Sequence, residues 1–433
     1  MTAAVSSGRS LSRASSTAAI VGPTVLRVPI AIAQFIALAL VARSAGSVAF
    51  GLVVFAQTAT RLGSALSLRG AGPLVLRRYA TDSVESARGV LRSEIRSSTR
   101  LVPVLLVPIV VVLGVTFDLS SRDQILLGAL LVLQLALGNV VRLGSEAVKG
   151  RQRPTAALGW EFGPAPIALV LVALLINVSG VSAGLIVLGA LVVGQLMSVI
   201  GLMVLAGLRG PVVPSAERME LKGGEGRLHL SVSTVITLAL PLGALGIAAI
   251  IGGGEAVGWL SASLRLLAPA TILISGVAAT FLPRIARLGD HRDSEGHAPL
   301  RASWLLVAGL SIPYSLALLI YPALAGHIFG PEFDGLENLV RLVAVGQLIN
   351  GATGIGVEVL QVTGRAMREA TTVVLAVAVA IAASVLAHTV GAMSAAQSGA
   401  AFFVTVVIIR SVAAGAAVYG PVFPQIVGLG RKS

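Results

Sequence analysis

The sequence contains no cysteine and few charged residues: Asp, Glu, Lys and Arg make up only 12% of its 433 residues. The absence of cysteine excludes disulfide bonds, thiolate metal sites and cysteine nucleophiles. So few charges leave too little polar surface for a water-soluble chain of this length. The sequence has no G-x-x-x-x-G-K-[ST] and no H-E-x-x-H motif, which argues against an ATPase and a membrane zinc protease. We therefore expect no enzyme activity, no catalytic residue, no cofactor and no bound metal.

Long apolar stretches make up most of the chain. Hydrophobic residues account for 55% of the sequence, and the mean hydropathy is +0.92. A membrane-spanning helix needs roughly 20 such residues. The pattern predicts an all-α polytopic membrane protein of about 12 transmembrane helices, with no room for a separate soluble domain. The apolar stretches are 17–42, 47–68, 101–117, 124–147, 156–177, 181–207, 230–252, 256–282, 302–324, 336–361, 370–389 and 394–419.

Basic residues are distributed unevenly among the connecting segments. Of the 32 Lys and Arg residues, 24 lie in one alternating set of loops and tails, and the other set holds only Arg43 and Arg122. Cytoplasmic loops carry the excess of basic residues in membrane proteins, so we expect both termini in the cytoplasm. The same bias explains the net charge of +13 without a nucleic-acid partner. Arginine far exceeds lysine and Ala, Gly and Val are abundant, as in GC-rich bacterial genomes. The predicted location is the bacterial cytoplasmic (inner) membrane.

A weak internal repeat divides the chain into two halves. Arg77 lies 26 residues after the glycine of Ala49-Phe50-Gly51, and Arg284 lies 26 residues after the glycine of Ala256-Val257-Gly258. Halves of six helices each enter the membrane from the same side, as parallel repeats do. We predict a cytoplasmic tail, a six-helix N-terminal lobe, a cytoplasmic linker, a six-helix C-terminal lobe and a second cytoplasmic tail at residues 1–16, 17–208, 209–228, 229–420 and 421–433.

Three arginines lie near the middle of predicted helices. Counting ~1.5 Å per residue across a core of ~30 Å places Arg27, Arg61 and Arg265 near the membrane midplane, where a side chain does not easily reach water. Ionisable groups at that depth face a cavity or a partner. Guanidinium groups match phosphate oxygens and stay charged, so one interpretation is a substrate-binding pocket for an anionic headgroup. The other is that each arginine pairs with a carboxylate or with carbonyl groups between helices.

One carboxylate and two prolines are further candidates. Glu161 lies about one and a half turns inside its predicted helix. It is either a proton-coupling group or the counter-ion of an arginine. Pro29 and Pro241 each remove a helix hydrogen bond and should bend their helices, so both are candidate gating positions.

Several segments resemble one family of transporters. Residues 40–51 (LVARSAGSVAFG) are similar to the turn between the first two helices of Wzx-type polysaccharide flippases. Residues 254–265 (GEAVGWLSASLR) and 281–287 (FLPRIAR) are similar to the helix 8 region of that family, and 328–333 (IFGPEF) and 359–365 (VLQVTGR) also resemble it. These flippases belong to the multidrug/oligosaccharidyl-lipid/polysaccharide exporter superfamily. The segments occur in matching order over most of the chain.

The resemblance implies a V-shaped pair of lobes that opens alternately to each side of the membrane. Its substrate would be an oligosaccharide linked to undecaprenyl pyrophosphate, flipped from the inner to the outer leaflet. Lipid II flippases of the same superfamily have functional arginines on helices 1, 2 and 8, the helices that carry Arg27, Arg61 and Arg265 here. Those flippases typically have fourteen helices, whereas this sequence predicts twelve.

Two other functions stay open. One is a cation-coupled multidrug exporter of the same superfamily, although that branch often carries an acidic residue in helix 1 and this helix 1 has none. The other is a non-transporting membrane scaffold of a glycan assembly complex. The expected partners are the lipid bilayer, a lipid-linked glycan and, in a glycan pathway, glycosyltransferases or a polysaccharide polymerase.

Overall fold

The computed structural model describes residues 7–151, 153–176, 178–206, 224–288, 294–362 and 366–419. Most of the predicted linker 209–228 and the whole predicted tail 421–433 lie outside these residues. The described chain is helical and contains no β-strand, which confirms the all-α prediction. Its helices are α1 (Ser7–Leu68), α2 (Ala71–Thr81), α3 (Val84–Arg100), α4 (Val102–Thr116), α5 (Ser121–Gly150), α6 (Pro154–Phe162), α7 (Pro164–Leu175), α8 (Gly180–Leu205), α9 (Gly224–Leu266), α10 (Ala268–Leu288), α11 (Ser294–Ile320), α12 (Leu324–Phe329), the 3-10 turn η1 (Pro331–Phe333), α13 (Glu337–Ala352), α14 (Gly356–Val362), α15 (Ala366–Thr389) and α16 (Ala395–Tyr419).

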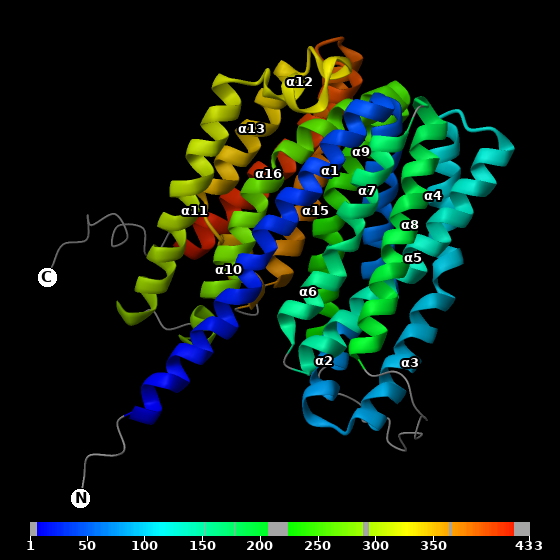
Figure 1. Ribbon diagram of the computed structural model, residues 1–433. Coiled ribbons are helices and arrows are strands. Elements are labelled where there is room, and N and C mark those ends of the chain that lie inside the picture. Colours follow the sequence, from blue (N-terminus) through cyan, green and yellow to red (C-terminus); the bar gives the residue numbers. More distant parts are fainter. Residues whose placement is uncertain are drawn as a thin grey trace, which may run out of the picture.

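Nine helical segments of the described chain are long and apolar enough to cross a membrane. Each of the twelve predicted stretches falls largely on helix. The numbers differ partly because two of the nine segments, Pro29–Leu68 and Leu238–Leu266, contain a break in helical geometry. In Figure 1, α1 rises to the upper end of the bundle and returns to the lower end, where α2 begins. The count of twelve and the cytoplasmic location of the termini stay predictions.

Glycine forms both breaks. Gly46 has φ 84° and ψ 174°, and Gly253 has φ 66° and ψ −159°, conformations that residues with a Cβ atom rarely adopt. Each lies five residues before a glycine of the sequence repeat, Gly51 or Gly258. A Cβ added to Gly51 would come within 2.7 Å of the backbone nitrogen of Gly258. The second arms of α1 and α9 therefore cross at equivalent positions of the repeat, and the division into two six-helix lobes stays a prediction.

Apolar side chains both fill the bundle and cover it. The main core cluster includes residues of both arms of α1 and of α9. On the outside, Val104 is 72% exposed, Ile250 83% and Ile320 81%. Large aliphatic side chains exposed to this degree fit a surface that acyl chains surround.

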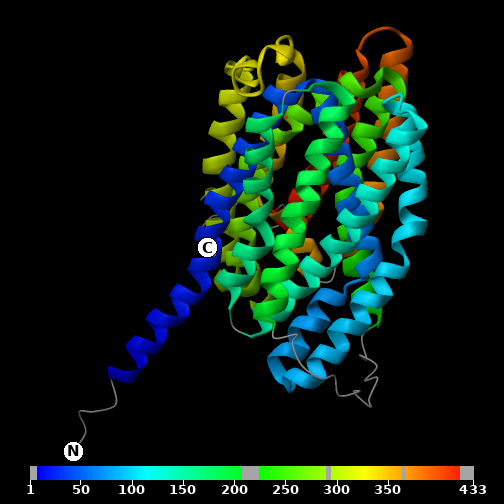
Figure 2. The same ribbon diagram turned by 45° about the vertical axis from the view of Figure 1, so that its right-hand side comes forward.

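The bundle has two distinct ends. The first turns of α1 lie at the same end as α2 and α3, and α12 lies at the opposite end (Figure 1). Turned by 45°, the molecule shows those first turns extending away from the other helices (Figure 2). Because α1 begins at Ser7, the predicted tail 1–16 is partly helical. The helix starts before the apolar stretch does.

The predicted helix 256–282 is interrupted. The helix α9 ends at Leu266, and α10 begins at Ala268. Pro269 accounts for the break, because proline lacks an N–H donor and favours the first turn of a new helix. The hydroxyl of Tyr314 donates a 2.5 Å hydrogen bond to the carbonyl of Leu266. The break places Arg265 in the last turn of α9.

Candidate functional site

Arg265 and Gln57 connect the two central helices. Arg265 lies at the end of α9, and Gln57 lies on the second arm of α1. The Nη2 atom of Arg265 donates a 3.1 Å hydrogen bond to Oε1 of Gln57. Gln57 is only 6% exposed, and Arg265 is half-buried. An amide oxygen accepts a hydrogen bond but carries no formal charge, so the positive charge of Arg265 is not neutralised by this contact.

Arg61 lies one helical turn after Gln57 on α1. The side chain of Arg61 is exposed. Its charge acts on the charge of Arg265, and Arg142 of α5 acts on Arg61 in the same way. In the described part of the chain, none of these three arginines forms an ion pair with a carboxylate. The three arginines therefore form a group of positive charges. Within this group, Arg265 donates a hydrogen bond to the uncharged amide of Gln57.

The structure brings together two of the three arginines predicted to bind substrate. Arg61 lies ~22 Å along its arm from Gly46, and Arg265 lies ~18 Å along its arm from Gly253, at ~1.5 Å per residue. Arg27 lies on α1, but its side chain falls outside the described part of the structure. We call Arg61, Arg142, Arg265 and Gln57 the arginine cluster. Arg142 was not singled out by the sequence, because it lies near the end of a predicted span.

Glu161 of α6 is bound by a serine and a lysine. The hydroxyl of Ser145 donates a 2.5 Å hydrogen bond to Oε2 of Glu161, and Nζ of Lys149 lies 3.4 Å from the same oxygen. Lys149 also lies 2.8 Å from Oε1 of Glu146. The cationic partner of Glu161 in the structure is therefore a lysine and not an arginine. A role for Glu161 in proton coupling stays a prediction.

The two candidate gating prolines lie within helical segments. Pro29 is part of α1, and Pro241 lies inside α9. Within the described parts of these helices, the backbone leaves helical geometry at Gly46 and Gly253 instead. A gating role for the prolines stays a prediction.

A second deep arginine has a carboxylate partner. Arg410 of α16 donates through Nε to Oε1 of Glu369 at 2.9 Å, and the two side chains form an ion pair. Glu369 is 3% exposed. A cavity of about 350 Å³ adjoins the pair and is also lined by Leu360, Thr372 and alanines of α16. The sequence did not single out Glu369, because it lies just before the apolar stretch 370–389.

Two charged side chains link α1 to α12 and η1. Arg43 of α1 donates through Nε to the carbonyl of Ile328 at 2.8 Å and through Nη2 to the carbonyl of His327. In return, Glu332 accepts a 2.8 Å hydrogen bond from the backbone N–H of Ser47, just after the break in α1. Arg43 of α1 thus binds backbone groups of α12, and Glu332 of η1 binds a backbone group of α1. Helix termini leave such groups without intrahelical partners, so the contacts satisfy both.

Aromatic rings fill the space behind these contacts. The ring centroids of Phe50 and Phe329 are 5.8 Å apart, and those of Phe50 and Phe333 are 6.0 Å apart. Phe35 lies 6.0 Å from Phe329. These separations are typical of favourable aromatic pairs. The buried rings therefore pack α12 and η1 against α1.

Comparisons with known proteins identify the fold. No protein-family model matches the sequence, and no curated protein matches it. The inward-facing conformation of a multidrug resistance MATE family transporter of the MOP superfamily gives a TM-score of 0.64, with 14% identity over 95% of this chain and 99% of that one. The lipid II flippase MurJ, in an inward closed conformation, gives 0.64, with 13% identity over 92% of this chain and 87% of that one. The outward-facing conformation of a MATE family transporter gives 0.52, with 12% identity over 94% and 96%.

Identities this low establish a likeness of fold alone. The superfamily that the sequence resemblance implied is the one named for the MATE structures, whereas the polysaccharide flippase branch stays a prediction. Together with the apolar helices, the comparisons show a multi-pass membrane protein with the fold of the MATE transporters and of the lipid II flippase.

Proposed function

We propose that the protein is a flippase that moves an oligosaccharide linked to undecaprenyl pyrophosphate from the inner to the outer leaflet by alternating access. The observation that carries the proposal is the arginine cluster, in which Arg61, Arg142 and Arg265 have no carboxylate partner among the described residues. A pyrophosphate group carries several negative charges, and its oxygens suit the planar fork of a guanidinium group.

The charge of the cluster favours an anionic substrate on energetic grounds. A positive charge inside a membrane protein is unfavourable unless water or an anion meets it. Because Arg61 is exposed, water and an anion both have access to its guanidinium group. In the proposed complex the arginines hold the pyrophosphate, the sugars occupy the hydrated space, and the lipid tail stays in the bilayer. Glycosyltransferases or a polysaccharide polymerase would act before or after this step.

The contacts of α1 with α12 and η1 support alternating access. Arg43 and Glu332 hold α1 against α12 and η1, and the predicted orientation makes this the outer end. The higher TM-score to an inward-facing transporter, 0.64, than to an outward-facing one, 0.52, agrees with contacts at that end. In the proposed cycle these contacts break when the protein opens to the outer side.

A multidrug exporter is the second candidate. A MATE transporter matches nearly the whole of both chains. A cationic drug would be repelled by the arginine cluster, so it needs another binding place. Among the described residues, the 350 Å³ cavity beside the Arg410–Glu369 ion pair is one such place, because the pair carries no net charge.

Transport by the purified protein in liposomes tests the proposal. The probe is a fluorescently labelled undecaprenyl-pyrophosphate oligosaccharide, and the variant is R61Q/R265Q. We expect translocation to fall at least about tenfold, because two charge-assisted contacts to the phosphates are lost. R122Q removes an exposed arginine at the start of α5 and serves as the control, with wild-type translocation expected.

Two outcomes would overturn the proposal. Unchanged translocation in R61Q/R265Q would show that the arginine cluster does not bind the substrate. Export of a cationic dye by the wild type, with no translocation of the glycan, would establish the second candidate. Protein level and melting temperature, measured for each variant, separate loss of binding from loss of folding.

A further inference from the structure

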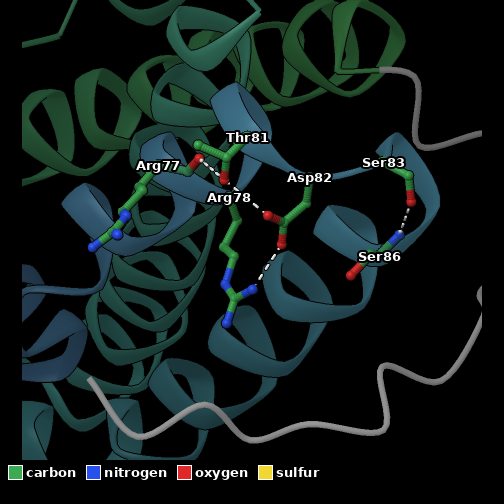
Figure 3. Close-up of polar contacts among 6 residues, drawn as sticks. All are labelled: Arg77, Arg78, Thr81, Asp82, Ser83 and Ser86. Carbon is green, nitrogen blue, oxygen red and sulfur yellow. Dashed lines mark hydrogen bonds and ion pairs between the residues drawn. The ribbon is translucent and has the colours of Figure 1, made fainter. Parts of the chain in front are cut away.

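The helices α2 and α3 form a fixed hairpin at the basic end of the bundle. Asp82 ends α2, and its backbone N–H donates to the carbonyl of Arg78 at 2.9 Å. The hydroxyl of Thr81 donates to Oδ1 of Asp82 at 2.8 Å. Ser83 caps α3 by accepting a 3.4 Å hydrogen bond from the N–H of Ser86. Figure 3 shows the hydrogen bonds between Thr81 and Asp82 and between Ser83 and Ser86 at the tip of the hairpin.

Asp82, the acidic residue at the end of α2, is already engaged. Nη1 of Arg78 lies 2.7 Å from Oδ2 of Asp82. The hydrogen bond from Arg78, with that from Thr81, lowers the pKa of Asp82 below its ordinary value. Asp82 therefore stays ionised and neutralises Arg78. Its charge is not available to the arginines farther along α3.

One face of α3 is anchored to the bundle. Ala87, Leu91 and Ser98 are buried, and the first two belong to a core cluster with Val141 and Leu143 of α5. Residues 69–100 contain seven arginines and only three acidic residues. Burial of the inner face fixes which arginines point outward. The basic surface is therefore a rigid feature of the fold.

The outward arginines continue the lipid-facing stripe of α4. The residue that joins α3 to α4 is itself in the right-handed helical conformation, so the helical repeat carries across the joint. Arg96 and Arg100 lie one turn apart and lead to Val104, Val107 and Val111, at spacings of three or four residues. The valines are 72%, 63% and 57% exposed, as expected for contact with acyl chains. Both arginines are also exposed.

Depth along the helix places these arginines at the headgroups. At ~1.5 Å per residue, Arg100 lies ~6 Å and Arg96 ~12 Å along the helix from Val104. The headgroup layer extends roughly 5–8 Å beyond the hydrocarbon core. With Val104 at the edge of the core, Arg100 lies within this layer, and Arg96 lies just outside it, where its long side chain reaches back to the headgroups. Glu94 lies two residues before Arg96 and so on a different face of the helix. Neither Arg96 nor Arg100 forms an ion pair with the described residues.

We infer that Arg96 and Arg100 form a binding site for anionic phospholipid headgroups of the leaflet next to the α2–α3 hairpin. The site is separate from the arginine cluster, and it does not depend on the proposed function. Guanidinium groups bind the phosphodiester of any phospholipid, and a net negative headgroup such as that of phosphatidylglycerol adds Coulomb attraction. The occupied site holds the hairpin at the membrane surface.

Lipid binding to the purified full-length protein, followed by native mass spectrometry, tests the inference. The protein in neutral detergent is titrated with phosphatidylglycerol and, separately, with phosphatidylcholine. Each basic residue near an anionic headgroup contributes about fivefold in affinity, so R96Q/R100Q should bind phosphatidylglycerol at least about tenfold more weakly. R122Q/R153Q removes two other exposed arginines and should bind as the wild type does. R96K/R100K keeps the charge and should retain most of the binding.

Three results would overturn the inference. The first is equal binding of phosphatidylglycerol by the wild type and by R96Q/R100Q. The second is a loss of phosphatidylglycerol binding in R122Q/R153Q as large as that in R96Q/R100Q. The third is displacement of the lipid by inorganic phosphate at equal concentration. The second result would mean that net charge alone attracts the lipid. The third would mean a site for free anions. The melting temperature of each variant, measured without lipid, shows whether the hairpin is intact.

Discussion

Arg410 and Arg265 both lie deep in apolar helices, but their surroundings differ in charge. Arg410 is held by the carboxylate of Glu369, which is 3% exposed. Arg265 is held by the amide oxygen of Gln57, and the charge of Arg61 acts on it. The same guanidinium group is neutralised by a partner in one place and left among other cations in the other.

The difference separates a structural role from a binding role. Removing a guanidinium group from water is unfavourable by several kcal/mol, and a buried carboxylate offsets much of that penalty. An amide offsets far less, so the arginine cluster is stable only where water or an anion reaches it. A pair such as Arg410–Glu369 needs nothing more, whereas the arginine cluster is suited to receive an anion.

Glu369→Gln tests the structural pair and should have the largest effect. The free energy of unfolding should fall by about 3–5 kcal/mol, because Arg410 keeps its buried charge and loses its partner. Thermal and denaturant unfolding in detergent measures the change. The double variant E369Q/R410M removes both charges and should recover most of the loss. A double variant as unstable as E369Q would show that the ion pair is not what stabilises this region.

Gln57→Glu gives Arg265 a carboxylate partner of the kind that Arg410 has in Glu369. The new carboxylate would lie about 3 Å from Nη2 of Arg265, where an ion pair forms readily. We expect the protein to be no less stable, and translocation of the pyrophosphate-linked glycan to fall at least about tenfold, because the carboxylate competes with the phosphate. Q57L removes the hydrogen bond but no charge and should translocate within about fivefold of wild type. Wild-type transport by Q57E would show that the charge of Arg265 is not used.

Arg61→Gln and Arg410→Gln make the same substitution at an arginine of the arginine cluster and at an arginine paired with a carboxylate. R61Q should change the free energy of unfolding by less than about 1 kcal/mol, because Arg61 has no carboxylate to leave behind and its like-charged neighbours are relieved. R410Q leaves Glu369 buried without its arginine and should be destabilising by about 3–5 kcal/mol. Unfolding curves recorded under one set of conditions measure both. A loss above about 2 kcal/mol in R61Q would mean that Arg61 is structural in the way Arg410 is.

The sequence predicted much of the fold for a physical reason. In a bilayer every backbone polar group must be satisfied within the segment, so apolar length alone indicates where helices lie. The depth count gave Arg61 and Arg265 similar depths, because rise per residue in a helix is constant, and in the structure the charge of Arg61 acts on Arg265; their place at the membrane midplane stays a prediction. The break after Leu266 was missed, although Pro269 was a signal for it.

The pairing of charges between helices was not predictable in the same way. Glu369 and Arg410 meet because α15 and α16 lie side by side, with Glu369 22 residues before Gly391 and Arg410 19 after it. That count suggests equal depth but does not fix which faces meet. One of the two interpretations of Glu161 paired it with an arginine, and the structure has Lys149, one turn beyond Ser145 on α5. Which faces meet depends on the rotation of each helix, and packing decides it.

Arg78 and Asp82 complete the comparison, because they form the same kind of ion pair at the water-exposed tip of the α2–α3 hairpin. The hydrogen bonds from Arg78 and Thr81 hold the pKa of Asp82 below its ordinary value of 3.8, so its contribution to stability is present above that value and is lost as the pH falls through the lowered pKa. We expect Asp82→Asn to lower the free energy of unfolding by less than about 1 kcal/mol at neutral pH, because water screens the pair. The difference from wild type should shrink in acid, which denaturant unfolding at a series of pH values measures. A loss as large as that of E369Q, or one that grows as the pH falls, would show that burial is not what distinguishes the two pairs.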